Sequence, residues 1–284
     1  MNSLMKKIDF VLFVSVRQAN PNGDPLLGNM PRTDYEGYGE ISDVCIKRKI
    51  RNRLQDMGHE IFVQANDRID DTYASLEDRF KAYFTTKQSD EEVAAAACQR
   101  WIDVRSFGQV MTFQKRALGI RGPVSVSLGK SLSPVDVITM QLTRSTNGMA
   151  SESGKRSADT MGTKHFVDFG VYKITGSMNC YFAQRTGFSD EDAQLIRQAL
   201  LSLFENDMSS ARPEGSMAVE KLYWFVHPNA LGIASSAKIH QLVQAQAPAD
   251  DKVHDFSDYV VSVDEERLNL YRQKGLKLEI EDGI

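Results

Sequence analysis

A strand pattern, a dense turn and a basic helix follow one another between residues 8 and 54, and this order constrains the fold more than any other feature. Residues 8–17 are rich in valine and phenylalanine, which is typical of a central β-strand. Residues 19–25 read Ala-Asn-Pro-Asn-Gly-Asp-Pro and form a strong turn signal. A strand that leads into an amide-rich loop beside a cationic helix suits contact with a phosphate backbone.

The predicted helix begins after Ser42 or Asp43, either of which can cap it, and Gly58 ends it. Apolar residues at near-helical spacing form a stripe that we expect to pack on the sheet. They are Ile46, Ile50, Leu54 and Met57. Cations flank the stripe, with Lys47, Arg48 and Arg51 on one side and Lys49 and Arg53 on the other. We expect the first three to lie on phosphates, and the alternative is a solvated charged face.

The rest of the chain adds an insertion, more strands and a second clear helix. Residues 59–100 read as a polar, mostly helical insertion. Strands are predicted at 123–128, 135–143, 167–182, 219–227 and 259–263, and helices at 235–246 and after Ser189. Without the insertion the order approximates β-α-β-β-α-β. We therefore predict an α+β fold with a ferredoxin-like or RRM-like sheet, which is a common RNA platform.

Residues 144–165 differ from their neighbours, because serine, glycine, threonine and methionine predominate and core residues are few. This composition predicts a long loop or hairpin, and loops of such length are usually functional or disordered. The basic residues of the segment are Arg144, Lys155, Arg156 and Lys164.

The net charge of −4 argues at first against nucleic acid as a partner, but it is unevenly distributed. Residues 249–284 contribute −5, which leaves +1 for the remaining 248 residues. Local patches decide whether a polyanion can dock. A hydrophobic content of 42% is ordinary for a globular protein, and no apolar run reaches membrane-spanning length. We expect a cytoplasmic protein with no membrane partner.

Signatures of catalysis are weak. The three cysteines and five histidines are dispersed, so we expect neither a metal site nor a cofactor. Residues 122–131 imitate a phosphate-binding P-loop, but six residues separate the two glycines where the motif has four. Asp24 and Asp34 could hold a metal near a bound phosphate, although aspartate beside proline or glycine is more often a turn residue. We predict no catalytic residue.

Four motifs in the same order resemble the RAMP-type backbone subunit of CRISPR effector complexes, and within that group the Cas-seven family of the type I-C (Dvulg) Cascade. They are Asn20-Pro21-Asn22-Gly23-Asp24-Pro25, Asp103-Val104-Arg105-Ser106-Phe107-Gly108, Gly119-Ile120-Arg121-Gly122-Pro123-Val124 and Met161-Gly162-Thr163-Lys164. The resemblance implies a hand-shaped molecule with a palm, fingers and a thumb. The implied limits are 1–58, 101–143 and 166–284 for a discontinuous RRM-like palm, 59–100 for the fingers and 144–165 for the thumb.

The resemblance implies a non-catalytic subunit that polymerises along CRISPR RNA and presents the guide for pairing with target DNA in antiviral defence. The implied partners are CRISPR RNA, target DNA, several copies of the chain and other Cascade subunits of the Cas-five and Cas-eight types. Such a guide holder contacts phosphate and ribose rather than base edges, because it must accept any spacer sequence.

The residues expected to contact RNA follow from this implied role. Asn20 and Asn22 would offer hydrogen bonds to the guide backbone, beside the helix cations Lys47, Arg48 and Arg51. Further candidates, any of which could instead form a structural ion pair, are Arg32, Arg105, Arg121 and Arg144. Lys155, Arg156 and Lys164 would serve the thumb, where Met149 and Met161 could wedge between bases or simply pack in a hairpin. Asp103 could pair with a local arginine.

Two other functions remain open. One is a RAMP-type endoribonuclease that cleaves guide precursor or target RNA, with Asp24 or Asp34 as its catalytic residue. The other is a sequence-specific RRM-like regulator, which would read bases with exposed aromatic residues on its central strands. Phe10 and Phe13 are the aromatic residues of the first strand, and we expect them to point to opposite faces and to be buried.

Overall fold

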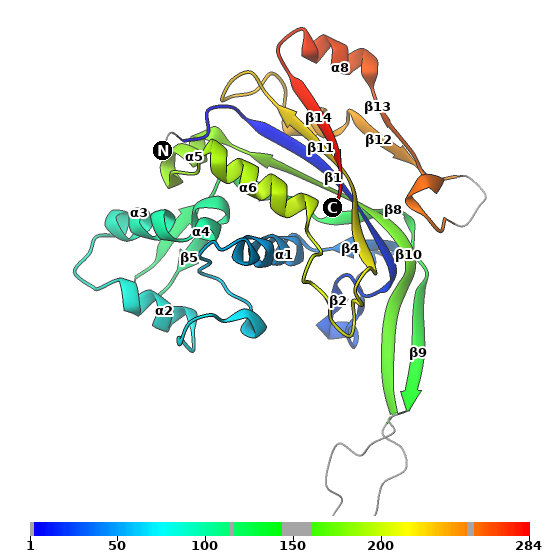
Figure 1. Cartoon of the computed structure of the whole chain (residues 1–284), viewed down its shortest axis with the longest axis horizontal. Helices are drawn as coiled ribbons and strands as arrows, with labels where there is room; N and C mark the ends of the chain where they lie inside the picture. Colours follow the sequence, from blue (N-terminus) through cyan, green and yellow to red (C-terminus); the bar gives the residue numbers. More distant parts are fainter. Residues whose placement is uncertain (1–2, 114–115, 144–160, 249–252) are drawn as a thin grey trace, which may run out of the picture.

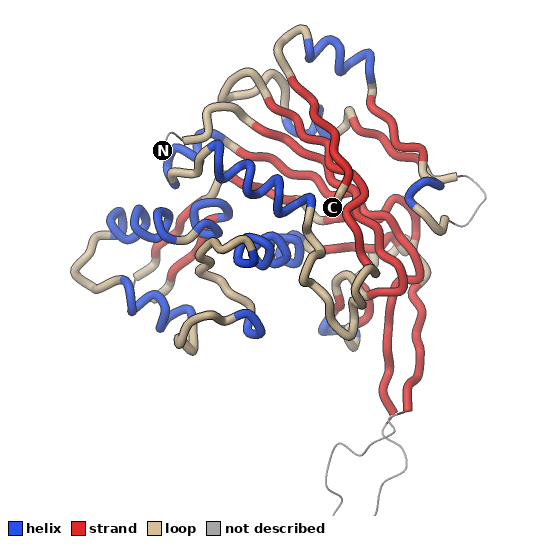
Figure 2. The backbone as a smooth tube through the Cα atoms, viewed as in Figure 1, coloured by secondary structure: helices blue, strands red, loops and turns tan. Residues whose placement is uncertain are grey.

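The computed structural model describes residues 3–113, 116–143, 161–248 and 253–284. These residues build one eight-stranded sheet, in which all the pairings are antiparallel (Figures 1 and 2). In spatial order its main path is β14 (Lys277–Asp282), β11 (Met217–Val226), β1 (Ile8–Ala19), β10 (Met161–Met178), β8 (Gly129–Pro134) and β4 (Tyr38–Ile41). Beside this path, β7 (Val124–Val126) and β9 (Val137–Thr143) also pair with β10.

Helices and short ribbons surround this sheet. The α-helices are α1 (Asp43–Asp56), α2 (Leu76–Tyr83), α3 (Asp90–Arg100), α4 (Ile102–Phe107), α5 (Cys180–Thr186), α6 (Asp190–Leu201), α7 (Ser236–His240) and α8 (Glu265–Arg272). The two-stranded ribbons are β2 (Gly23–Asp24) with β3 (Met30–Pro31), β5 (Gly108–Met111) with β6 (Leu118–Arg121), and β12 (Val243–Gln246) with β13 (Val260–Val263). Short 3₁₀ turns are η1 (Pro25–Leu27), η2 (Asn66–Arg68) and η3 (Phe256–Asp258).

The central strand β1 is buried on both faces of the sheet. Phe10 belongs to the core that contains the apolar residues of α1 and α6. Phe13 belongs to a second core, on the other face, that contains residues of α7, α8 and β12. Alternation of side chains along a strand places residues an odd number of positions apart on opposite faces. The expected opposite orientation and burial of the two phenylalanines are thus confirmed.

The first helix forms as its sequence pattern indicates. The Ser42 hydroxyl accepts a hydrogen bond from the Cys45 backbone N–H at 3.2 Å and caps the helix. Ile46, Ile50 and Leu54 are fully buried against the sheet. Gly58 follows the helix with a φ of +87°, a conformation that glycine adopts without strain.

A third hydrophobic core lies away from the sheet, among α2, α3, α4 and the β5–β6 ribbon (Figure 1). Phe62, Phe80 and Phe84 pack there with Trp101, and the rings of Phe62 and Trp101 have centroids 4.6 Å apart. The core also contains residues of β5 and β6, so it extends past residue 100, where we expected the insertion to end.

The hairpin of β9 and β10 projects from the sheet and leads to the expected thumb (Figure 1). Residues 144–160 lie outside the described residues, and 161–165 belong to β10. β10 runs unbroken through Gly170 and Gly176. The strand predicted at 167–182 was wrong at its C-terminal end. The Asn179 side chain caps α5, which begins at Cys180.

The C-terminal region differs from its prediction in two respects. The expected helix at 235–246 is the short α7 followed by the strand β12. Beyond β13, both α8 and β14 were missed, although β14 forms an edge of the main sheet. Acidic residues of β14 pair within the chain, because Arg197 contacts both Glu279 and Glu281. Among the described helices, none combines the length and the apolar content that crossing a bilayer requires.

Candidate nucleic-acid interface

An open groove of about 480 Å³ lies between α1 and the β5–β6 ribbon. Its lining contains three cations and no carboxylate. The lining residues are Val44, Lys47, Arg48, Arg51, Val63, Phe107, Gly108, Gln109, Val110 and Ile120. The three cations are those that flank one side of the apolar stripe, and the folding of α1 onto the sheet turns them toward the ribbon.

Among the described residues, neither Lys47 nor Arg48 pairs with a buried carboxylate. The Lys47 ammonium lies 3.0 Å from a carboxylate oxygen of Asp43, one turn earlier on α1, and both side chains are partly exposed. Such pairs contribute little and exchange partners readily. Arg48 donates a hydrogen bond to the Val63 carbonyl at 2.6 Å. Burial and, second, the neighbouring charge of Arg51 lower the pKa of Arg48, so an anion in the groove would relieve an existing repulsion.

The third cation, Arg51, is anchored to a buried carboxylate. Asp103 is 1% exposed at its side chain and lies 3.0 Å from the Arg51 Nε. The same carboxylate accepts hydrogen bonds from the backbone N–H groups of Phe62, at 2.8 Å, and Val63, at 3.1 Å. The expected pairing of Asp103 with a local arginine is confirmed. This junction ties α1, α4 and residues 62–63 together, and so fixes the wall of the groove.

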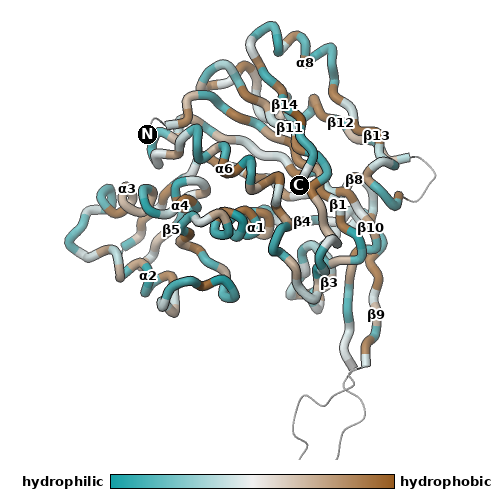
Figure 3. Tube along the Cα trace, in the orientation of Figure 1, coloured by the Kyte–Doolittle hydropathy of each residue, from teal (hydrophilic) through white to brown (hydrophobic). Residues whose placement is uncertain are grey.

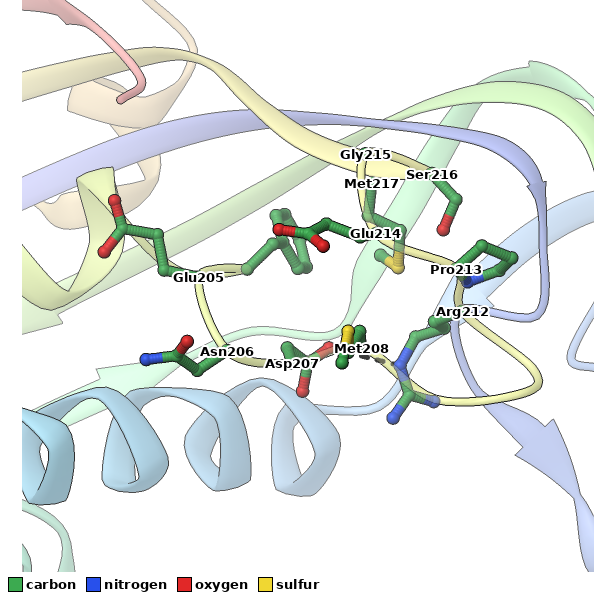
Figure 4. A pocket seen from close by; sticks show the side chains of 11 residues that line it. Glu205, Asn206, Asp207, Met208, Arg212, Pro213, Glu214, Gly215, Ser216 and Met217 are labelled. Atoms are coloured by element: carbon green, nitrogen blue, oxygen red, sulfur yellow. Dashed lines mark hydrogen bonds and ion pairs between the residues drawn. The ribbon is translucent and has the colours of Figure 1, made fainter.

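The cations on the other side of α1 are covered by the loop that follows α6. Lys49 is buried and pairs with Asp207, while Arg53 lies 2.8 Å from a carboxylate oxygen of Glu205. Burial lowers the pKa of Lys49, with Asp207 opposing that effect. Figure 4 shows Asp207 and Arg212 side by side on this loop above α1, joined at 3.1 Å. The hollow enclosed by the loop carries more acids than bases, and it therefore suits a polyanion poorly.

Of the two asparagines of the first turn, Asn20 is buried and Asn22 is half-buried. Asn20 is 2% exposed, and its amide donates a hydrogen bond to the Asn29 carbonyl at 2.7 Å. The side-chain Oδ1 of Asn22 accepts a hydrogen bond from the Ser42 backbone N–H at 2.8 Å. The burial of Asn20 corrects the expectation that its side chain is offered to a guide, whereas the expectation for Asn22 stays a prediction. The hydrogen bonds of both side chains hold the turn against the start of α1.

Three of the four further arginine candidates lie among the described residues, and each has different neighbours. Arg105 makes two parallel hydrogen bonds to Asp192, at 2.9 and 2.8 Å, so the alternative of a structural ion pair is the one observed. Arg32 lies 3.4 Å from Asp24. Arg121 is exposed, with its guanidinium 4.4 Å from the centroid of the Phe182 ring. Arg144 lies outside the described residues.

Of the thumb candidates, only Lys164 lies within the described residues, and Lys155 and Arg156 do not. Lys164 sits on β10, with its ammonium 6.0 Å from the centroid of the Phe166 ring. Met149 is likewise outside the described residues, and the side chain of Met161 is not described. β9 pairs with this part of β10, and one face of β9 carries the exposed side chains of Ile138, Met140 and Leu142.

The two aspartates proposed for catalysis organise turns. Asp24 accepts a hydrogen bond from the Leu26 N–H at 3.0 Å. Asp34 accepts bonds from two backbone N–H groups and lies 2.7 Å from Lys130, whose hydrogen bond lowers the pKa of Asp34. Within the part of the chain that the structure describes, no cluster of three metal-binding side chains occurs.

Some residues of this surface were missed in the sequence. Val44 and Val110 border the groove and are exposed, although each is apolar. Arg185 stacks on the exposed ring of Tyr181, at 4.5 Å from its centroid. The spacing of Tyr181 and Arg185, four residues apart in a helix, was the signal that could have revealed this pair.

Comparison with known proteins gives a consistent result. The family model described as "CRISPR-associated protein Cas7" matches residues 6–264. A curated protein of Haloferax volcanii, "CRISPR-associated protein Cas7", is 26% identical over an alignment of 221 residues, with 70% of this chain and 65% of that protein covered. The chain thus spans just under two thirds of this relative's length.

Two solved structures share the fold at 13% identity. A chain of a "CRISPR RNA-guided surveillance complex, pre-nicking" matches with a TM-score of 0.53 over 87% of this chain and 82% of its own. A chain of a "CRISPR RNA-guided surveillance complex" matches with a TM-score of 0.54 over 97% and 88%, respectively. At this level of identity the match establishes the mixed α/β fold with its large antiparallel sheet.

Proposed function

The chain belongs to the Cas7 family of CRISPR-associated proteins, and we propose that it is a non-catalytic backbone subunit of a type I-C (Dvulg) Cascade in the cytoplasm. The observation that carries this proposal is the groove beside α1, where Lys47, Arg48 and Arg51 meet in a lining without carboxylates. In this role the groove holds the sugar-phosphate backbone of CRISPR RNA and leaves the bases free to pair with target DNA.

The chemistry of the groove favours phosphate over base recognition. A lysine and two arginines supply charge and N–H donors, which bind phosphate oxygens without reading sequence. The central strands offer no aromatic platform, because Phe10 and Phe13 are fully buried. This burial argues against the RRM-like regulator, which would stack bases on exposed rings of its sheet.

We propose a hand-like division of labour within the chain. A ferredoxin-like palm is supported by the spatial order β11, β1, β10, β7 and by the shared core of the sheet with α1 and α6. The fingers extend to about residue 120, where the third core ends. The β9–β10 hairpin is the base of the thumb, and its exposed apolar face would contact bases or a neighbouring copy.

The proposed partners follow from this arrangement. They are CRISPR RNA, target DNA through guide pairing, further copies of the chain along the guide, and other subunits of the Cas-five and Cas-eight types. Of the residues expected to bind RNA, we retain Asn22, Arg32, Lys47, Arg48, Arg51, Arg121 and Lys164. The thumb cations Arg144, Lys155 and Arg156 remain proposals from sequence alone.

Lys47→Ala combined with Arg48→Ala is expected to weaken RNA binding about equally for all sequences. Loss of two phosphate contacts should reduce the slope of log Kobs against log salt by about 1.4, since each contact to a single strand contributes about 0.7. Arg51 is left in place because its loss would strand the buried Asp103. Fluorescence anisotropy with unrelated RNA sequences over a salt series measures both quantities.

The matched control removes two exposed lysines from the other end of the molecule, Lys274→Ala with Lys277→Ala. This control should keep the wild-type slope. An unchanged salt slope in the groove variant would mean that α1 does not contact the RNA. Binding that depended on RNA sequence at equal length would favour the regulator.

Purified protein incubated with labelled RNA and a divalent metal ion is expected to leave the RNA intact. Asp24 and Asp34 already use their carboxylate oxygens to hold turns, which leaves little capacity to coordinate a metal. Gel electrophoresis of the products is the measurement. Metal-dependent cleavage that disappears in Asp24→Ala or Asp34→Ala would establish the endoribonuclease instead.

A further inference from the structure

A cluster of aromatic and cationic side chains, three of them exposed and one half-buried, lies where α5 meets β6. The guanidinium of Arg121 lies 4.4 Å from the centroid of Phe182, and that of Arg185 lies 4.5 Å from the centroid of Tyr181. The two rings contact each other edge to face, with centroids 5.4 Å apart. We call these four residues, Arg121, Tyr181, Phe182 and Arg185, the α5 platform.

The two arginines of the α5 platform are not neutralised. Among the described residues, neither arginine forms an ion pair with a carboxylate. Most of the other described arginines do form one. An arginine stacked on a ring keeps its in-plane N–H donors and its outer face available. Arg185 donates one hydrogen bond to the Tyr181 hydroxyl, which fixes the plane of the guanidinium and leaves further donors unused. Tyr181 is itself 57% exposed.

The α5 platform continues the surface of the α1 groove. Gly108 lines the groove and is the register partner of Arg121 across the β5–β6 ribbon. Val110, 66% exposed, lines the groove on the same face of the ribbon and is paired with Gly119. A side chain at Gly119 would meet no atom within 4 Å, so the ribbon is open to solvent at this position. β6 in turn contacts α5.

We propose that the α5 platform is a second contact for the single-stranded RNA that occupies the groove. There a base stacks on a guanidinium plane, or the phosphate between two bases accepts hydrogen bonds from the two arginines. This inference rests on the proposed function, because it extends the path of the same strand. An unpaired strand that crosses the ribbon reaches two planar cations with free donors. Stacking on aromatic and guanidinium planes is tolerant of sequence, as a guide holder requires.

Charge and continuity favour RNA over a protein partner at this surface. Arginine and tyrosine are also enriched at protein interfaces, where they sit in well-packed, desolvated pockets. The α5 platform instead lies at the end of a groove that already carries three cations. An RNA strand bound at both the groove and the α5 platform binds more tightly than at either alone, because the second contact forms within one complex.

The test compares the full-length protein, stripped of nucleic acid, with Arg121→Ala combined with Arg185→Ala. Oligouridylates of increasing length are the probe, because they stack weakly and form no hairpins. Short oligomers that fill only the groove should bind both proteins equally. Longer oligomers should bind the variant about tenfold more weakly, which is within the range for loss of one stacking contact. Both side chains are exposed, so the variant should fold normally.

A second variant, Arg121→Lys with Arg185→Lys, separates stacking from charge. Lysine keeps the charge and loses the planar group, so the salt slope should return to the wild-type value while the affinity for long oligomers stays low. The Lys47→Ala and Arg48→Ala variant reports on the groove and should weaken binding at every length.

The outcomes distinguish the two proposals. If the platform variant binds every length as the wild type does, while the groove variant does not, the platform is not an RNA site and the proposed function stands. If both variants bind as the wild type does, both proposals fail. Wild-type RNA binding by the platform variant, together with loss of co-purifying subunits, would assign the surface to a protein partner and overturn the inference.

Discussion

Asp103→Ala is expected to lower the free energy of unfolding by about 3–5 kcal/mol, the range found when one partner of a buried ion pair is removed. The carboxylate is 1% exposed and is the acceptor for the Arg51 side chain and for the backbone N–H groups of Phe62 and Val63. Its removal leaves a buried guanidinium and two N–H groups without their partner. Urea denaturation followed by circular dichroism measures the change.

Glu77→Ala provides the matched control for this prediction. Glu77 also pairs with a cation, Lys81, but both side chains are about half exposed on α2. Exposed pairs of this kind contribute about 0–1 kcal/mol, so the control should unfold close to the wild type. If both variants unfolded at the same urea concentration, Asp103 would not be the junction between α1 and the third core that its contacts indicate.

Elements with a strong local pattern could be predicted from sequence. β1 was found from its run of valine and phenylalanine, and α1 from the three-to-four residue spacing of its apolar residues, and both signals are contained within the element itself. The helix after Ser189 was found from its cap and its acidic first turn, and it is α6. β14 was missed because its sequence is mostly charged, and its strand conformation depends on pairing with β11.

The candidate site was predictable only in part, because the cations of α1 have partners far away in the chain. Lys49 and Lys47 look alike in sequence, yet Lys49 pairs with Asp207 in a loop 158 residues later. Arg105 similarly finds Asp192 on α6. A local pattern gives the face on which a charge lies, but not whether a distant carboxylate will cover it. The groove itself needs the β5–β6 ribbon, which no sequence signal placed beside α1.

A buried polar cluster that the sequence did not reveal lies on the face of the sheet opposite α1. Asp9 of β1 is fully buried, 2.7 Å from the His227 Nε2 and 3.1 Å from the Lys7 ammonium. The His227 Nδ1 accepts a hydrogen bond from the Ile233 N–H at 3.1 Å, so its proton lies on Nε2 and is donated to Asp9. His240 on α7 lies 3.8 Å from the same carboxylate.

Asp9→Asn is expected to lower the free energy of unfolding by about 3 kcal/mol at neutral pH. Asparagine keeps the volume of the side chain but removes the charge that balances Lys7 in a buried site. Glu266→Gln makes the same chemical change at an exposed position and should cost less than about 0.5 kcal/mol. Guanidinium chloride denaturation of both variants and the wild type is the measurement.

The stabilisation that the Asp9 carboxylate provides is expected to depend on pH. Burial raises the pKa of Asp9, but hydrogen bonding from His227 and the charge of Lys7 help to outweigh burial, so the pKa lies below its ordinary value of 3.8. A carboxyl group with a lower pKa in the folded state stabilises the fold above its unfolded pKa, and this contribution is lost as the pH falls through the folded value. The difference between the wild type and Asp9→Asn should therefore be largest near neutral pH and shrink below about pH 4. A difference that stays constant or grows in acid would mean that the ionised carboxylate does not stabilise the fold.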